Sequence, residues 1–284
     1  MGFRKGFLVL VFFLQFGACS FAEELVTASQ QIGDFSLSGF GERGKKSWDI
    51  AGESADIIDN VVKLKKVVGN HYAEKDKVNL TADTGDFNKN SGLVHLEKNV
   101  VITTASGTKL TTDSLDWDRK QQMVSTLDKV NVDRQNMNLS GTGAKGQTAL
   151  KQVMLEKNVS LDINAATQKG AKMEKIVITC DGPLDIDYEK NIAVFNNNVK
   201  VEKSDLTIFS DKMQVYFNQK QQPEKGSDPM SMSSSINKIV SQGNVRIIRG
   251  ENISYSQEAI YTASDKKITL TGRPQIIIYQ TETQ

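Results

Sequence analysis

The chain has 284 residues, of which 38% are hydrophobic and 24% are charged. This composition is ordinary for a soluble protein with a modest core, and the length allows one elongated domain or two domains of average size. The 35 basic and 34 acidic residues nearly cancel, which leaves a formal net charge of +1. Because no basic stripe is visible, the sequence argues against a nucleic-acid-binding protein.

Residues 1–22 have the organisation of a secretory signal. A basic pair precedes an apolar run from Phe7 to Leu14, which is shorter than the ~20 residues of a membrane span. Three outcomes remain open: cleavage after Ala22, lipid modification of Cys19 at the end of a lipobox-like segment, and retention as an uncleaved anchor. Export is expected in each case, with membrane attachment in the second and third.

Cysteine content argues against a disulfide-stabilised protein. After cleavage behind Ala22 only Cys180 remains, so no internal disulfide is available. Cys180 ends an apolar run that begins at Ile176, and we expect it to be a buried strand residue.

The first segments after the leader predict strands with one ambiguity. Residues 23–34 are expected to be a polar leader, and strands are expected at 35–40 and around Trp48–Gly52. Residues 54–68 fit either one face of a helix or a strand with a bulge between Leu64 and Val67. The strand-rich context favours the strand.

One short strand phrase then occurs four times, at 94–102, 153–161, 194–201 and 239–247. In each copy apolar residues alternate on one face, a Lys, Asn or Gly interrupts the stripe, and an Asn-Val pair resumes it in the same register. Period-2 alternation marks half-buried strands. Because repeated strands bury their apolar faces against each other, the sequence predicts an all-β stack or an elongated jelly roll.

Polar segments separate the alternating stretches and are expected to be turns. They are Asn88–Gly92, Asp118–Lys120, Glu189–Asn191, Asn218–Lys220 and Asp265–Lys267. Residues 164–174 are polar with small residues at their centre, which predicts a module boundary. Residues 219–235 contain two prolines, a glycine and a Met-Ser run, and predict a long, flexible, exposed loop.

Several segments of the second half form a recognisable set: Cys180–Tyr188, Ala193–Val199, Ser210–Tyr216, Gly243–Val245, Glu258–Tyr261 and Leu270–Pro274. Together they resemble the OstA-like module of the LptA family of lipopolysaccharide-transport proteins, over residues 174–280. In the first half, Trp48–Ile50, Ala55–Asp56, Leu80–Asp83, Gly92–Leu96 and Leu110–Leu115 resemble the related LptC family, over residues 35–165. The resemblance leaves open whether the chain acts as LptC, as LptA or as a fusion of both.

The resemblance implies an open, twisted β-jelly roll of two facing sheets in two consecutive modules. It also implies a periplasmic bridge protein of outer-membrane biogenesis, which would shield lipopolysaccharide acyl chains in an apolar groove. The implied partners are lipopolysaccharide, other Lpt bridge proteins and an ATP-powered ABC transporter complex in the inner membrane. No cofactor is implied. Open sheet edges near Phe35–Phe40 and Gln275–Tyr279 would join copies or partners edge to edge.

The inward stripes are the candidate lipid-contact residues. A site for acyl chains must be apolar along its length, because each buried CH₂ contributes ~0.8 kcal/mol. From the pattern alone, a filled sandwich core without a ligand is the simpler interpretation, whereas the resemblance favours lipid contact. The candidates are Val100, Ile102, Leu110, Leu115, Trp117, Val159, Leu161, Phe195, Val199, Val201, Ile208, Met213, Val215, Phe217, Val245, Ile247, Ile260 and Leu270.

Two alternatives stand beside the carrier. One is a structural β-stack, such as an adhesin, with a filled core. The other is a carbohydrate-active enzyme that uses the carboxylate pairs Asp116/Asp118 and Asp185/Asp187. Both pairs run into predicted turns and neither has a full calcium loop, so we interpret them as solvated side chains and expect no enzyme. The two histidines, His71 and His95, suggest no metal site.

Overall fold

The computed structural model describes residues 30–41, 44–72, 77–105, 107–134, 136–147, 152–166, 173–217, 236–265 and 267–279. The predicted signal segment 1–22 with Cys19, the turn at 218–220 and the loop at 219–235 lie outside these residues, so those predictions stay predictions. The polar leader expected at 23–34 is wrong for residues 30–34, which belong to the first strand, Gln30–Phe40.

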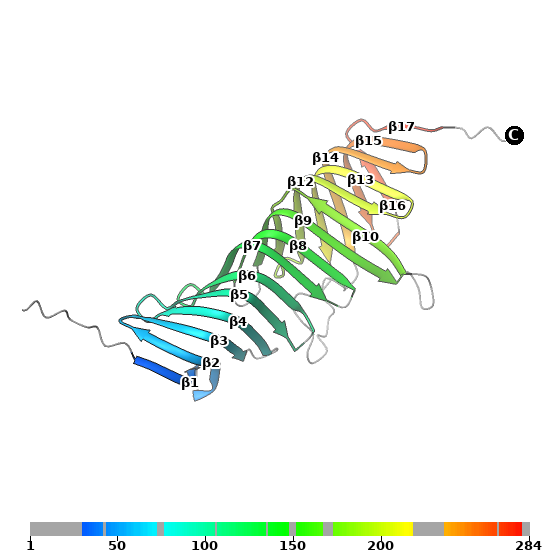
Figure 1. The fold of residues 1–284 in the computed structure, drawn as a ribbon. Coiled ribbons are helices and arrows are strands. Elements are labelled where there is room, and N and C mark those ends of the chain that lie inside the picture. Colours follow the sequence, from blue (N-terminus) through cyan, green and yellow to red (C-terminus); the bar gives the residue numbers. More distant parts are fainter. Residues whose placement is uncertain are drawn as a thin grey trace, which may run out of the picture.

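The described residues form one antiparallel sheet of 17 strands and contain no α-helix, which confirms the all-β prediction (Figure 1). The strands of the first half are β1 (Gln30–Phe40), β2 (Lys46–Ile58), β3 (Val61–Tyr72), β4 (Lys77–Asn88), β5 (Leu93–Thr104), β6 (Lys109–Asp118), β7 (Met123–Arg134), β8 (Met137–Gln147) and β9 (Gln152–Ala166). Those of the second half are β10 (Met173–Cys180), β11 (Leu184–Asp187), β12 (Ile192–Lys203), β13 (Leu206–Phe217), β14 (Ile236–Arg249), β15 (Asn252–Thr262), β16 (Lys267–Thr271) and β17 (Gln275–Ile277).

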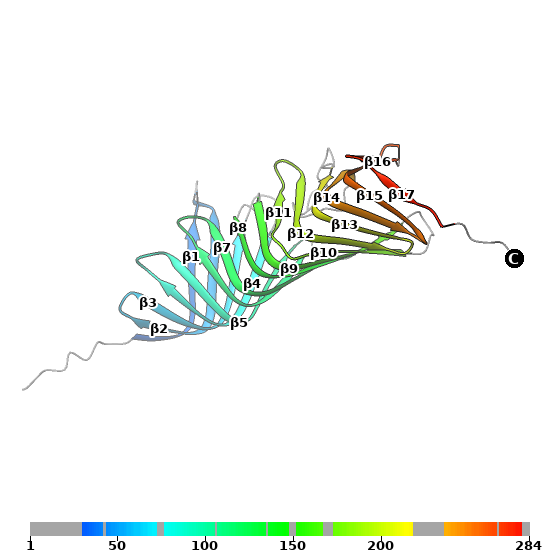
Figure 2. The same ribbon diagram turned by 90° about the horizontal axis from the view of Figure 1, so that it is seen from above.

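Almost every strand pairs with its neighbour in the sequence. β9 pairs with both β10 and β11, and both of these pair with β12. β15 likewise pairs with both β16 and β17. Each of these pairs of short strands therefore takes the place of one long strand that is interrupted midway. Figures 1 and 2 show the result, an elongated, twisted sheet whose long strands bend so that two layers face each other.

The bend is encoded in the repeated phrase. Asn99, Asn158, Asn198 and Asn244 all have positive φ angles, of 52°, 52°, 52° and 46°. Asparagine tolerates this left-handed conformation better than most residues. The pairing register shifts at the same points in β5, β12 and β14. The interruption is thus a β-bulge that bends the strand while its apolar side chains keep facing the interior on both sides.

A glycine–proline break replaces the bulge in the interrupted strands. Gly182, between β10 and β11, has a φ of 102°, and a Cβ there would lie 2.3 Å from the carbonyl oxygen of Glu156. Gly272, between β16 and β17, has a φ of 75°. Only glycine combines this conformation with such a close backbone approach.

The ambiguous segment 54–68 is extended, as the strand interpretation predicted. β2 and β3 are joined by a tight turn at Asp59-Asn60. Leu64 and Val67 are both buried, at 4% and 1% exposure, because Lys66 between them adopts a φ of 52°. A bulge with period-2 alternation on either side imitates helical spacing over these few residues.

β9 and β10, which flank the predicted boundary at 164–174, pair directly with each other; residues 167–172 lie outside the described residues. β10 pairs with β9 from Met173–Ala166 to Cys180–Val159. The buried side chains instead fall into a cluster within β2–β6, a larger one within β7–β13 and a small one within β14–β15. The larger cluster crosses the predicted boundary, so packing continues from one half of the chain into the other.

Candidate lipid groove

Two rows of cross-strand neighbours run along the interior, one on each side of the bend. Directly paired residues share a sheet face, so the register of the strand pairs defines each row. The first row is Leu37, Ile50, Gly69, Leu80, Ile102, Leu110, Val132, Leu139, Leu161, Ile178, Val201, Ile208, Ile247, Ser254 and Ile276. It crosses the sheet from β1 to β17 without a charged residue.

The second row lies on the other side of the bend. It consists of Ile57, Val62, Phe87, Val94, Trp117, Val124, Gly146, Val153, Ile186, Ala193, Val215, Ile239, Tyr261 and Ile268. This row also contains no charged residue. The two rows give the interior an apolar lining along its whole length, which is the geometry that a channel for acyl chains requires.

The interior is open in the first half and closed in the second. A groove of about 220 Å³ runs between the two rows from β2 to β9, with Leu80, Ile102 and Leu110 on one side and Trp117 and Val124 on the other. These side chains are half-buried. From β9 to β13 the row positions are packed, and Leu161, Ile178 and Val215 are 2%, 6% and 8% exposed.

The predicted site residues fall into three groups. Twelve are buried in the interior: Val100, Leu115, Val159, Leu161, Phe195, Val199, Val201, Met213, Val215, Phe217, Val245 and Ile247. Five are partly buried on the interior side: Ile102, Leu110, Trp117, Ile208 and Leu270. This placement fits both a lipid-lined interior and a filled core, so lipid contact stays a prediction.

The expectation that Ile260 faces the interior is wrong. Ile260 pairs with Val240 and Thr269, whereas its neighbour Ala259 pairs with Leu270 and belongs to the core. In β15 the buried residues on either side of the bend are Ser256 and Ala259, three positions apart. The inward and outward positions of β15 therefore exchange at the bend, and small side chains occupy the inward positions next to it.

Several groove residues were not predicted, among them Trp48, Leu80, Val124, Val132 and Leu139. Most lie on strands that carry no copy of the repeated phrase. The alternation of apolar and polar residues is hard to recognise in these strands, because threonine or glycine occupies neighbouring inward positions, such as Thr126 and Gly141. The pairing of these strands with the repeated ones is the signal that identifies them.

Two tryptophans meet across the groove. Trp48 pairs with His71 on the first side of the bend and Trp117 lies in the second row, yet their rings are 6.4 Å apart and edge to face. The Arg119 guanidinium stacks over Trp48, with 4.4 Å between Cζ and the ring centroid. The two layers thus make direct aromatic contact beside the groove, between β2 and β6.

The carboxylate pairs take part in surface structure. Asp116 accepts from Nδ1 of His95 at 2.6 Å, and with Glu97 it raises the pKa of that histidine. Asp118 and Asp187 accept backbone N–H bonds in the turns that follow their strands. Burial raises the pKa of Asp185, which accepts a hydrogen bond from Asn196. The roles of Asp116, Asp118 and Asp187 agree with solvated and turn-capping side chains, whereas Asp185 is partly buried.

Among the residues that the structure describes, no cluster of three or more His, Cys, Asp or Glu side chains could hold a metal ion. The same residues contain no helical segment with the length and hydrophobicity of a membrane span.

Comparisons with known proteins place both halves of the chain. Residues 26–164 match the family described as "Lipopolysaccharide-assembly, LptC-related". Residues 182–283 match the family described as "LptA/(LptD N-terminal domain) LPS transport protein". A search of curated protein sequences gave no match.

Among solved structures, the chain is similar to LptH from Pseudomonas aeruginosa, described as the LptA homologous periplasmic component of the conserved lipopolysaccharide transport device. The two share 11% sequence identity with a TM-score of 0.33, over 61% of this chain and 95% of that one. The family matches agree with the resemblance found in the sequence and concern transport and assembly proteins rather than enzymes. The first half of the chain therefore matches the LptC-related lipopolysaccharide-assembly family, and the second half matches the LptA/LptD N-terminal family.

Proposed function

We propose that this chain is a periplasmic, non-catalytic carrier that holds the acyl chains of lipopolysaccharide in its interior while the sugars stay in water. The observation that carries the proposal is the pair of uncharged interior rows, which border an open apolar groove between β2 and β9. Both matched families take part in lipopolysaccharide transport or assembly.

The physical argument is the transfer of acyl chain from water to an apolar surface. Each buried CH₂ contributes ~0.8 kcal/mol, so a stretch of about eight methylenes contributes ~6 kcal/mol. Burial of methylene groups is the only interaction that the groove needs in order to hold an acyl chain. Movement along the interior would be driven from outside the chain, by new molecules that an ATP-powered extractor supplies.

A filled structural β-stack is the second candidate, and the close packing between β9 and β13 favours it. Phe195, Leu184 and Met213 are each no more than 1% exposed there. In the carrier account, lipid occupies the open first half, and passage through the second half requires the two layers to separate.

Photo-crosslinking separates these candidates. A crosslinking residue is placed singly at inward Ile102 and Leu110, and at outward Val101 and Thr111, which form the adjacent cross-strand pair. The carrier account predicts lipopolysaccharide adducts at the inward pair and few at the outward pair in exporting cells. Equal labelling of both faces, or no adducts at all, would contradict it and favour the filled stack.

The two ends of the sheet are the proposed contact sites for other copies or other bridge proteins. β1 pairs only with β2, and Leu37 and Phe40 on it are 43% and 67% exposed. At the other end, Ile276 and Ile278 are 63% and 70% exposed. Unpaired, apolar edges invite strand addition. Deleting residues 275–284 should weaken self-association or partner capture, and unchanged association would place the contact elsewhere.

Export is proposed from the leader at residues 1–22. The mature chain should begin near Glu23 or at an acylated Cys19, and mass spectrometry of the mature N-terminus distinguishes the two. An intact Met1 in the cell envelope would exclude both and leave an uncleaved anchor.

A further inference from the structure

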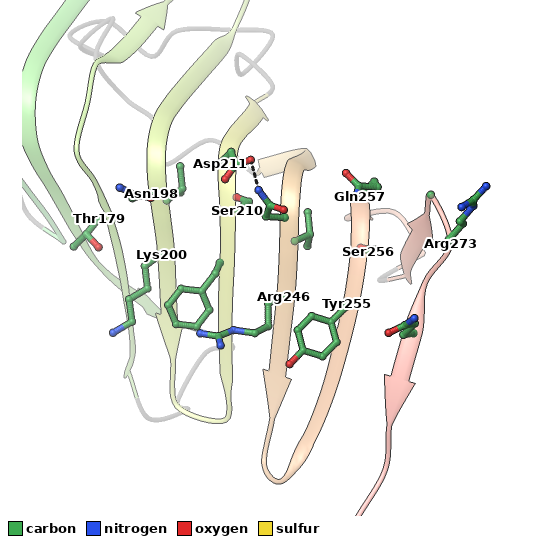
Figure 3. A pocket seen from close by; sticks show the side chains of 16 residues that line it. Thr179, Asn198, Lys200, Ser210, Asp211, Arg246, Tyr255, Ser256, Gln257 and Arg273 are labelled. Atoms are coloured by element: carbon green, nitrogen blue, oxygen red, sulfur yellow. Dashed lines mark hydrogen bonds between the residues drawn. The ribbon is translucent and has the colours of Figure 1, made fainter.

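A second concave site lies on the outside of the sheet, over β12 to β17. It has a volume of about 730 Å³ and is lined by residues of these strands and of the Gly272–Arg273 break (Figure 3). Lys200, Phe209, Arg246 and Tyr255 form one cross-strand row on its floor. They alternate with Val199 and Val245, which are 1% exposed and also border the cleft. The cleft shares no lining residue with the apolar groove between β2 and β9.

The cleft is rich in positive charge. Its lining contains three basic side chains, Lys200, Arg246 and Arg273, and one carboxylate, that of Asp211. The Asp211 carboxylate accepts a hydrogen bond from the Asn244 amide at 2.9 Å, and Figure 3 shows this pair apart from the Arg246 head group. The carboxylate is therefore engaged, and the cleft retains an excess of cations.

Two of these cations converge on one aromatic ring. The Arg246 Cζ lies 4.3 Å from the Phe209 ring centroid, and the Lys200 Nζ lies 5.9 Å from the same centroid. Lys200 is also paired with Glu202 at 2.6 Å. Within the described part of the chain, no carboxylate lies within ion-pair distance of Arg246, whereas Arg249 on the same strand lies 3.8 Å from Asp205. The planar Arg246 guanidinium is thus stacked, fixed and free to donate along its edge.

The rest of the lining suits a sugar ring. Figure 3 shows Tyr255 beside Arg246 on the neighbouring strand, and Tyr255 is 39% exposed. The aromatic face of Tyr255 can pack against the apolar face of a pyranose, whereas the Phe209 ring is covered by Arg246 and Lys200. The side-chain amides of Gln257 and Gln275 border the same cleft and can bond hydroxyl groups. A volume of this size is typical of small-molecule sites.

We propose that this outer cleft binds an acidic saccharide, with Arg246 bonding a phosphate or carboxylate and with Tyr255 packing against the sugar ring. An arginine positioned over an aromatic ring, as Arg246 is over Phe209, can present paired donors to such an anion. The site is distinct from the proposed lipid groove and does not depend on it.

The test is an amide NMR titration of the full chain with glucose 1-phosphate, with glucose and inorganic phosphate as partial ligands. Glucose 1-phosphate should shift resonances of β12 to β15 saturably, and each partial ligand should bind at least about tenfold more weakly. Arg246→Gln should weaken binding about 10- to 100-fold, the usual range for a lost charged hydrogen bond. The matched control Arg249→Gln, on the same strand but outside the cleft, should leave it unchanged.

Several results would overturn the proposal. Absent shifts would show that there is no site, and phosphate binding as tightly as the sugar phosphate would show a plain anion site. Equal weakening by Arg249→Gln would show unspecific charge attraction. Binding to phosphatidylglycerol vesicles that Arg246→Gln abolishes, without sugar-phosphate binding, would assign the cleft to a membrane surface.

Two controls make these outcomes unambiguous. Arg246→Gln should lower the thermal midpoint of the parent only slightly, because the partly exposed Arg246 loses its contact with Phe209 but no ion pair among the described residues. Crosslinking at Ile102 should be unaffected by this substitution. If the parent chain binds the sugar phosphate but forms no lipopolysaccharide adducts at Ile102, the proposed carrier function is rejected and the proposed saccharide site is retained.

Discussion

A glycine in the first interior row offers a direct way to fill the groove. Gly69 lies between Ile50 and Leu80 in that row and lines the groove. A Cβ at Gly69 would be 3.6 Å from a methyl carbon of Leu80 and 3.8 Å from Ile50 Cγ1, which are ordinary contact distances. Its φ is not in the left-handed region. Larger side chains at this position therefore project into the groove without backbone strain.

The size of the effect follows from the displaced lipid. Gly69→Ala should raise stability by about 0.4–1 kcal/mol, because the unfolded chain loses freedom. Gly69→Leu adds four carbon atoms and should exclude about four methylenes of bound chain. At ~0.8 kcal/mol each this is about 3 kcal/mol, or roughly 150-fold in the dissociation constant of an acyl probe.

The assay combines displacement of a fluorescent fatty acid with thermal unfolding. The matched control is Gly33→Leu, because Gly33 lies on edge strand β1 with no atom within 4 Å of an added Cβ. Gly33→Leu should bind the probe normally. Unchanged probe affinity for Gly69→Leu, with an unfolding midpoint at or above that of the parent, would show that acyl chains do not occupy this groove.

Three further predictions concern the fold that holds the groove. Phe195→Ala should destabilise the chain by about 3–5 kcal/mol in urea unfolding, because Phe195 is 1% exposed in the largest core cluster; a loss below ~1 kcal/mol would contradict the packing. Asn198→Val should lower the free energy of unfolding by about 1–2 kcal/mol, because the bulge needs a positive φ at this position. Asn198→Gly should lower it by much less, and equal losses for the two variants would argue against a strained bend. Hydrogen bonds from Lys46 and Asn70 lower the pKa of Asp49 from 3.8 to about 2. The contribution of Asp49 to the free energy of unfolding should therefore be complete above pH 4 and disappear as the pH falls toward 2. The Asp49→Asn variant should lack this pH-dependent contribution when unfolding is measured across the same range.

The sequence predicts the architecture because the same pattern of alternating apolar residues is repeated. The alternation before and after Asn99 or Asn198 predicts both the strand and the face of the strand that is buried. The role of the interruption is less visible, since Lys98, Asn197 and Gly243 share no chemistry except tolerance of positive φ. A sequence pattern shows that the stripe resumes in register, but only the backbone shows that the strand bends there.

The candidate site is predicted in outline and missed in detail. Ile260 is more hydrophobic than Ala259, so hydrophobicity alone selects the wrong face, and the phase change in β15 depends on how that strand crosses the bend. The sequence also does not show whether the interior is open or packed at a given position. Ile102 and Val201 are both row positions on repeated strands, yet Ile102 borders the groove and Val201 is packed. The separation between the two layers decides this, and it is a property of the assembled sheet.

The central claim is that acyl chains travel inside the sheet, along the two interior rows. Methyl NMR of the Ile-, Leu- and Val-labelled chain with a spin-labelled acyl chain tests it most directly, because the label broadens only nearby methyl groups. The account predicts strong broadening at inward Ile102, Leu110 and Val124 and sharp signals at outward Val101 and Val194. Broadening of the outward methyls to the same extent, or sharp signals at every inward position with lipid bound, would contradict it.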